Sequence, residues 1–204
     1  MTILLVDDHA LVRAGLKRLL ATQWDGEILE AADGREALAI LRGRMPELTI
    51  LDLNLPGLGG LELLRRMIQA GAPAILVLTM HAEPLYAKRA LDAGAAGYMT
   101  KNASPEELLL AVRRVTAGGR YVEADLAQAL AAPAAGGRQT LDTLTARELE
   151  IMRLLAKGSS LAEIAQAVGV GYKTVANNCG QIKSKLGVSR TADLVRLAIE
   201  TGVG

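Results

Sequence analysis

Five polar residues in the first half of the chain have types and spacing suited to phosphoryl chemistry. Each follows a short apolar run, and they are Asp7, Asp8, Asp52, Thr79 and Lys101. Neighbouring carboxylates repel one another by about 1 kcal/mol per pair even in water, so three acids at one place favour a bound cation. Oxygen ligands select Mg²⁺, which with the Lys101 ammonium would neutralise a transferring phosphoryl group, while the Thr79 hydroxyl could bond the product. The pattern predicts Asp52 as the nucleophile.

These side chains can meet only if the fold brings the ends of the apolar runs together. The runs at 3–6, 48–51, 74–78 and 97–100, with a shorter one near Ile28, alternate with amphipathic stretches. Five β-α units in alternation predict a doubly wound α/β fold with a parallel five-stranded sheet. The carboxyl ends of parallel strands share one edge, where ligands bind. We therefore expect the five polar residues along that edge.

This order of residues resembles that of a known family. An acid pair after the first strand, a D-x-N-x-P-G run that begins at Asp52, a Thr after the fourth strand and a Lys after the fifth make residues 1–120 similar to the receiver domain of two-component response regulators. The resemblance implies that Asp52 accepts phosphate from a histidine kinase and that Thr79 and Lys101 contact the phosphoryl group. It also implies that Tyr98 is the aromatic switch residue. The implied Mg²⁺ ligands are Asp7, Asp8, Asp52 and the Asn54 carbonyl.

The second half of the chain has the helix start and stop signals of a small helical domain. Thr145 with Glu148, and Ser160 with Glu163, make capping boxes that open two helices, each of which ends at a glycine. A third helix is predicted over about 172–186, and a fourth follows it. The short loop between the second and third helices has helix-turn-helix spacing. We expect a receiver over 1–120, a linker with a short helix over 121–140, and an all-α four-helix domain over 141–204.

The third predicted helix has two different faces. Its apolar face should pack into the core and holds Val175, Cys179, Ile182 and Leu186. Its opposite face is polar and acid-free, so it could lie in a major groove, where Asn and Gln pair with adenine and Lys contacts phosphate or guanine. The candidate DNA-binding residues are Lys173, Thr174, Asn177, Asn178, Gln181 and Lys185. An ordinary charged face in a protein-binding bundle remains the alternative.

The stretches LTARELEIMRLLAKGSSLAEIA, KTVANN and KSKLGVSRTADLV make this half resemble the DNA-binding domain of NarL/FixJ (LuxR-type) regulators. One departure matters: where the family commonly has basic or His residues, this chain has Ala176, Asn177, Asn178 and Gly180. Base preference therefore does not carry over from the family. Few contacts per monomer predict a homodimer on paired half-sites, with phosphorylation promoting its association.

Composition limits the remaining possibilities. Half of the 204 residues are hydrophobic, there is no Phe, and the formal net charge is +1, so the chain as a whole is not strongly basic. The single cysteine rules out an intrachain disulfide and suits a reducing compartment. The first residues lack a secretion-signal pattern, and no apolar run approaches the roughly 18 residues of a membrane span. These features predict a cytoplasmic protein without a membrane partner.

Three functions remain, and we favour a phosphorylation-dependent transcription regulator that is not itself an enzyme. An Mg²⁺-dependent phosphohydrolase could also use Asp52, although such enzymes usually have a second carboxylate two residues later, where this chain has Asn54. The third possibility is a protein that binds DNA constitutively and whose receiver domain serves only as a docking module. His9 and His81 have no metal-binding spacing, and we expect both to be surface or loop residues.

Overall fold

The computed structural model describes residues 1–204 except 57, 132–140, 142, 202 and 204. The chain divides into two compact units, and the first spans Met1–Ala131. That unit contains a parallel sheet with the strand order β2-β1-β3-β4-β5-β6. Its strands are β1 (Ile3–Val6), β2 (Ile28–Ala31), β3 (Leu48–Leu51), β4 (Ile75–Thr79), β5 (Gly97–Thr100) and β6 (Tyr121–Val122).

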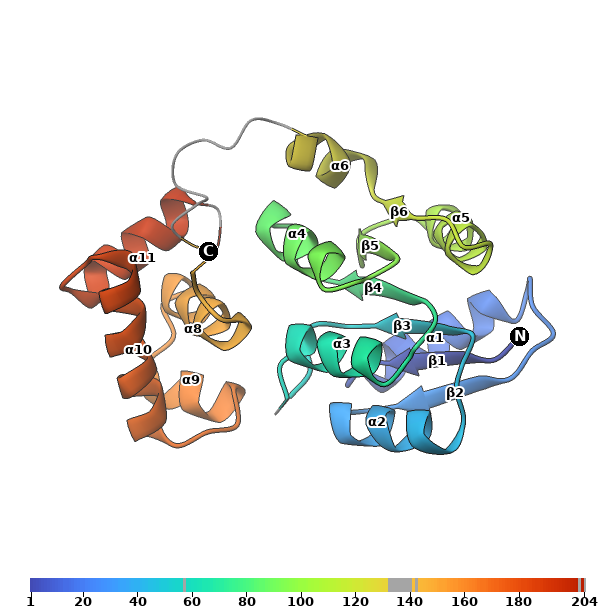
Figure 1. Cartoon of the computed structure of the whole chain (residues 1–204), viewed down its shortest axis with the longest axis horizontal. Coiled ribbons are helices and arrows are strands. Elements are labelled where there is room, and N and C mark those ends of the chain that lie inside the picture. The colour runs from blue at the N-terminus through green and yellow to red at the C-terminus, as the bar shows by residue number, and fades with distance from the viewer. Residues whose placement is uncertain (57, 132–140, 142, 202, 204) are drawn as a thin grey trace. The chain divides into compact units, whose positions relative to one another are not determined.

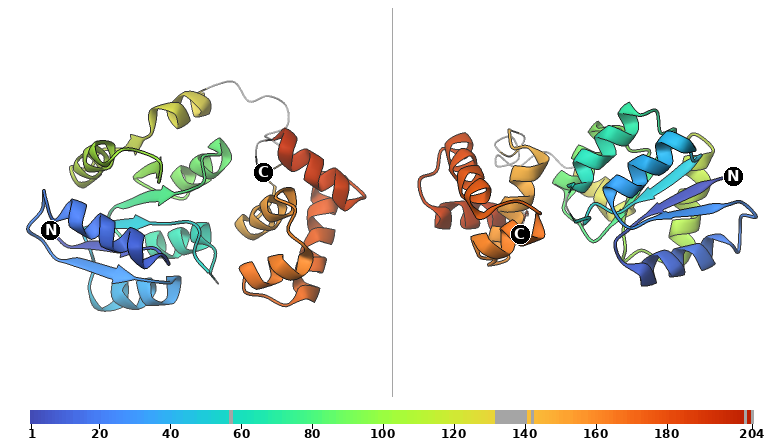
Figure 2. Two further views of the ribbon diagram at one scale, coloured as in Figure 1. Left: turned by 180° about the vertical axis from the view of Figure 1, so that it is seen from behind. Right: turned by 90° about the horizontal axis from the view of Figure 1, so that it is seen from below.

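Helices cover both faces of this sheet. They are α1 (Ala10–Leu20), α2 (Gly34–Gly43), α3 (Gly60–Gln69), α4 (Pro84–Asp92), α5 (Pro105–Thr116) and α6 (Ala124–Ala131). Helices α1 and α5 lie on one face, and α2, α3 and α4 lie on the other (Figures 1 and 2). Every residue of β1, β3, β4 and β5 is buried, as is usual for a parallel sheet covered on both sides. The predicted doubly wound α/β fold is confirmed.

The sheet has six strands instead of the expected five. Strand β6 is two residues long and pairs with β5, with Tyr121 opposite Gly97 and Val122 opposite Tyr98. A strand this short has no measurable hydrophobic alternation, which is why the sequence pattern did not reveal it. We expected 121–140 to be a linker with a short helix, but β6 and α6 lie within the first unit, where α6 packs on α4. The part around 133–137 lies outside the described residues.

From residue 143 onward, the described part of the second unit contains four helices. They are α8 (Ala146–Ala156), α9 (Leu161–Ala167), α10 (Tyr172–Leu186) and α11 (Thr191–Glu200). The capping boxes that open α8 and α9 form as predicted. Buried side chains from all four helices make its core, including Leu149, Ile164, Ile182 and Leu194. In neither unit does a described helix have both the length and the apolar character needed to cross a membrane.

Glycine is required where α3 begins, next to the loop that follows β3. A Cβ added at Gly60 would lie 2.3–2.7 Å from backbone atoms of Leu53, and backbone cannot move aside as a flexible side chain can. Gly60→Ala should therefore destabilise the first unit by about 1–3 kcal/mol. The matched control is Gly15→Ala in α1, where a Cβ meets nothing within 4 Å and should stabilise by about 0.5–1 kcal/mol. Urea unfolding followed by fluorescence of Trp24, the single tryptophan, which packs on the receiver core, measures both.

Candidate functional site

The carboxyl ends of β1 and β3 bring acidic groups together at one edge of the sheet. Asp7 and Asp52 directly follow these neighbouring strands and are only 3% and 2% exposed. One carboxylate oxygen from each of Asp7, Asp8 and Asp52 and one ring nitrogen of His9 all lie within 4.8 Å of one another. Buried carboxylates at this spacing repel strongly and make a set of oxygen donors that fits a hard divalent cation.

Lys101 balances the charge of the two buried acids. Its Nζ lies 2.6 Å from an oxygen of Asp7 and 2.6 Å from an oxygen of Asp52, so one ammonium links the ends of β1, β3 and β5. Burial lowers the pKa of the Lys101 ammonium, but the bonds to Asp52 and Asp7 outweigh it, and the pKa is raised overall. The ammonium therefore stays charged at neutral pH and holds the carboxylates together.

Backbone amides orient the carboxylates. The Asn54 N–H donates to Oδ1 of Asp52 at 2.9 Å, and the His9 N–H donates to Oδ1 of Asp7 at 2.8 Å. The His9 ring also contacts the acids, with Nδ1 2.7 Å from Asp8 Oδ1. His9 is an exposed residue directly before α1, as expected of a surface or loop residue, and its contact with the acids could be suspected only from its position directly after the acid pair. The Asn54 carbonyl as a metal ligand stays a prediction.

A second set of contacts joins Thr79 and Tyr98. Both side chains are fully buried, and each bonds the backbone of His81: the His81 N–H donates to Thr79 Oγ1 at 3.4 Å, and the Tyr98 hydroxyl donates to the His81 carbonyl at 2.9 Å. Lys101 joins this set through its N–H, which donates to the Thr79 carbonyl at 2.8 Å. The loop after β4 therefore connects Thr79, an expected phosphoryl contact, with Tyr98, the expected aromatic switch residue.

His81 is in a loop, as expected, but its side chain is buried. The imidazole is 1% exposed and stacks on the Tyr86 ring, with 4.2 Å between centroids. Its Nδ1 lies 3.5 Å from an oxygen of Glu83. Sequence spacing gave no sign of this burial, because it depends on how the loop packs against α4.

In the second unit, α10 has the two faces that the sequence predicts. The four apolar residues of the inner face, Val175, Cys179, Ile182 and Leu186, are buried. Lys173, Thr174, Asn177 and Gln181 are exposed, and Asn178 is partly exposed. These five candidate DNA-binding side chains are thus available on the surface of one helix.

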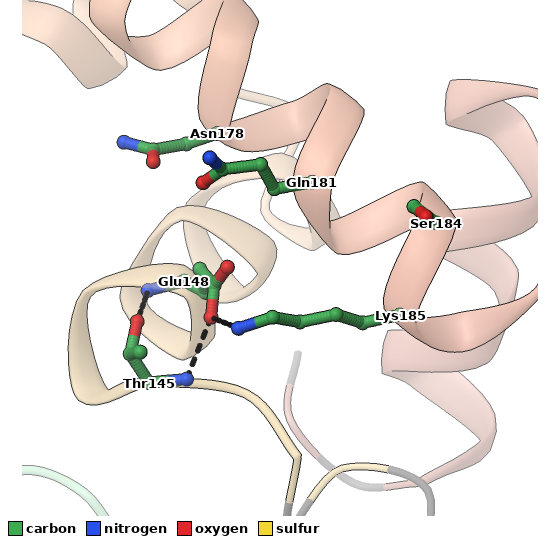
Figure 3. A pocket seen from close by; sticks show the side chains of 6 residues that line it. All are labelled: Thr145, Glu148, Asn178, Gln181, Ser184 and Lys185. Carbon is green, nitrogen blue, oxygen red and sulfur yellow. Dashed lines mark hydrogen bonds and ion pairs between the residues drawn. The ribbon is translucent and has the colours of Figure 1, made fainter.

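Lys185 differs from the other candidates because it is engaged within the protein. Its Nζ lies 2.6 Å from Oε2 of Glu148, a buried residue near the start of α8 (Figure 3). The same Glu148 oxygen accepts the Thr145 N–H at 2.7 Å. Asn178, Gln181 and Ser184 complete the wall of a pocket of about 500 Å³ around this pair. The ion pair links α10 to α8. It also neutralises the charge of Lys185, which we expected to contact DNA.

The Glu148 carboxyl has a shifted pKa for a reason visible in Figure 3. Burial raises the pKa of this group, but the bonds from Lys185 and Thr145 outweigh that effect, so the pKa lies below its usual value of 4.5. Glu148 is therefore ionised throughout the neutral range, and its contribution to folding depends on that charge.

Comparison with known proteins identifies the family. A model described as "Response regulator receiver domain" matches residues 3–113, and one described as "Bacterial regulatory proteins, luxR family" matches residues 142–198. The chain belongs to the NarL/FixJ family of two-component response regulators. Among relatives of this response regulator, the transcriptional activator protein ExaE of Pseudomonas putida is 45% identical over 100% of this chain and 98% of its own. The transcriptional regulatory protein UhpA of Escherichia coli (strain K12) is 40% identical and covers 96% of each chain.

Solved structures of other response regulators are similar to this chain. A LuxR-family two-component response regulator from Aurantimonas sp. SI85-9A1 is 41% identical over 64% of this chain and 94% of its own, with a TM-score of 0.58. RcsB from Salmonella enterica serovar Typhimurium, bound to promoter P1flhDC in the presence of phosphomimetic BeF3-, is 25% identical over 97% of each chain, with a TM-score of 0.69. The family is one of DNA-binding transcription regulators, as we expected.

The Glu148–Lys185 pair predicts how the second unit responds to acid. A lowered folded pKa stabilises the unit above pH 4.5, and this stabilisation is lost as pH falls through the folded pKa. Glu148→Gln should cost about 1–3 kcal/mol at pH 7, and its deficit relative to the unaltered chain should shrink as the pH falls below 4.5.

Labelling of the buried Cys179 thiol by dithiodipyridine in urea reports the opening of the second unit. The control is Glu163→Gln, which replaces the exposed capping-box acid of α9 and should cost less at neutral pH. A Glu148→Gln deficit that stays constant from pH 7 to pH 3 would contradict the role of the pair.

Proposed function

We propose that Asp52 is the phosphoacceptor of this response regulator and that a histidine kinase supplies the phosphoryl group. In this reaction the phosphorus–nitrogen bond of the donor breaks, and a bond forms between phosphorus and a carboxylate oxygen of Asp52. The observation that carries the proposal is the buried Asp52 carboxylate, which is fixed by the Asn54 N–H on one oxygen and by Lys101 on the other. A cytoplasmic location stays a prediction.

The surrounding residues support this chemistry. The donor set Asp7, Asp8, Asp52 and the Asn54 carbonyl would hold Mg²⁺, which supplies positive charge against the oxygens of the transferring group. Lys101 would move part of its interaction from Asp7 and Asp52 to the phosphoryl oxygens, because these add a charge of about −1.5 to −2. Thr79, at the end of the neighbouring strand, would donate its hydroxyl to the same oxygens.

Phosphorylation of Asp52 is directly testable. Incubation of the full chain with acetyl phosphate and Mg²⁺ should place one acid-stable, base-labile phosphoryl group on Asp52, and Asp52→Ala or chelation of Mg²⁺ should abolish it. The control is Asp92→Ala, which removes an exposed carboxylate of α4 and should leave labelling unchanged. Stable label on a Ser, Thr or His would contradict the proposal. Sustained turnover of small phosphate esters would contradict it too and would indicate a phosphohydrolase.

We further propose that phosphorylation promotes dimerisation and that the polar face of α10 reads DNA. The exposed amides of Asn177 and Gln181 support base readout, and the exposed Lys173 supports phosphate contact. Binding of RcsB to promoter DNA in the presence of a phosphomimetic is consistent with such a mechanism. Because Lys185 is paired with Glu148, we assign the main phosphate contact of this helix to Lys173.

The contributions of Lys173 and Asn177 to DNA affinity can be measured separately. The DNA is a duplex selected from a random pool by its binding to the phosphorylated full chain. Lys173→Ala should weaken binding to selected and random DNA alike and reduce the salt slope by about 1, because one phosphate contact is lost. Asn177→Ala should cost about 1–3 kcal/mol on the selected duplex and little on random DNA. Salt titrations of both variants give these values. Equal losses on both duplexes for Asn177→Ala would show that this residue does not read bases.

A further inference from the structure

Glu123, between β6 and α6, makes contacts that the proposed phosphotransfer does not use. Its carboxylate accepts two hydrogen bonds from Thr100, at the end of β5: the backbone N–H lies 2.7 Å from Oε2, and the hydroxyl lies 3.3 Å from Oε1. The Glu123 N–H donates to the Tyr98 carbonyl at 3.1 Å. Glu123 thus makes three hydrogen bonds to the end of β5.

These contacts lie next to the candidate phosphorylation site. Thr100 is covalently followed by Lys101, whose ammonium bonds Asp52. Tyr98 donates its hydroxyl to the carbonyl of His81, in the loop that also bonds Thr79. A displacement of Lys101 or of the loop after β4 would therefore also move Thr100 or Tyr98, the residues to which Glu123 is hydrogen-bonded.

Glu123 is also the start of α6. Its carbonyl accepts the Ala127 N–H at 2.9 Å, which is the first helical bond of that segment. Leu126, in the first turn of α6, is buried, and α6 packs on α4. Helix α6 is the last described helix of the first unit, and the chain continues from it towards the DNA-binding unit.

The direction of the Glu123 side chain is informative. A polar residue that precedes a helix usually bonds the free N–H groups of that helix, whereas this carboxylate reaches back to a residue 23 positions earlier in the chain. Bonds from a charged acceptor to a backbone N–H belong to the stronger class and are directional. The carboxylate therefore makes the position of α6 depend on the end of β5.

We propose that Glu123 is a positioning residue that transmits the phosphorylation state of Asp52 from the end of β5 to helix α6. The inference rests on the proposed function. When Lys101 turns from Asp7 and Asp52 towards a phosphoryl group, the backbone at Thr100 shifts with it, and the Glu123 carboxylate carries the shift to the first turn of α6. The end of β5 and the start of α6 must be able to take up two arrangements, one without and one with the phosphoryl group. The phosphoryl group then changes the relative populations of these two arrangements.

Hydrogen exchange of the full chain, read by mass spectrometry with and without acetyl phosphate and Mg²⁺, tests this route. In the unaltered chain, phosphorylation should change exchange both in 98–103 and in 124–131. Glu123→Ala should label at Asp52 within twofold of the unaltered chain and keep the change in 98–103, but lose most of the change in 124–131. Glu123→Gln keeps an acceptor oxygen for the Thr100 N–H and should restore at least half of it. Asp125→Asn, which removes an exposed charge from the same helix, should behave as the unaltered chain.

The outcomes separate this inference from the proposed function. If the unaltered chain takes no label at Asp52, the proposed function fails and the inference fails with it. If it is labelled but 124–131 does not respond, or if Glu123→Ala responds in 124–131 as fully as the unaltered chain, only the inference is overturned. If the Glu123→Ala chain unfolds, Glu123→Gln decides: a 124–131 response that is reduced but at least half of that in the unaltered chain, with normal labelling at Asp52, supports the route, whereas an undiminished response, or one below half, overturns it.

Discussion

The ammonium of Lys101 between two buried carboxylates is the interaction on which the receiver's edge depends. Asp7 and Asp52 end adjacent strands, and burial of two like charges without a counterion would be strongly unfavourable. A lysine after β5 supplies the countercharge and, because it bonds both acids, fixes the ends of three strands relative to one another. This arrangement is poised for change: added negative charge at Asp52 competes for the same ammonium, so the site cannot accept a phosphoryl group without redistributing those bonds.

Redistribution at one residue matters only if a second arrangement of the neighbouring elements responds to it. At the ends of β4 and β5, the bonds form a short connected set along which such a response would travel. Thr79 and Tyr98 both bond the backbone of His81, and Tyr98 and Thr100 both bond Glu123. A phosphoryl group can shift such a set only through interactions that differ between its two arrangements. In the proposed function, Lys101 and Thr79 would make those interactions.

Much of this structure could be predicted from the sequence, for identifiable reasons. The strands of the core are apolar runs that end in Asp, Thr or Lys, and the rule that parallel strands place these ends at one edge was sufficient to assemble the site. The capping boxes at Thr145 and Ser160 are local, so their sequence signal is strong, and both form. Strand β6 was missed because two residues carry no periodicity. The burial of His81 and the Glu148–Lys185 pair were missed because they arise from tertiary packing, which spacing along the chain does not encode.

The Glu148–Lys185 pair also changes the expected charge of the DNA-binding face. The sequence suggests several cations and no acid between residues 170 and 190, but Lys185 is paired with Glu148 and Arg190 with Asp193. An ion pair still attracts a phosphate, but far less than a free cation does, because the partner's negative charge lies within a few ångströms. The exposed amides of α10 can discriminate among bases but contribute little long-range attraction. A single unit with this face would therefore bind DNA weakly and with modest salt dependence, which gives the proposed phosphorylation-dependent dimerisation its physical basis, because two linked units bind a paired site much more tightly than one.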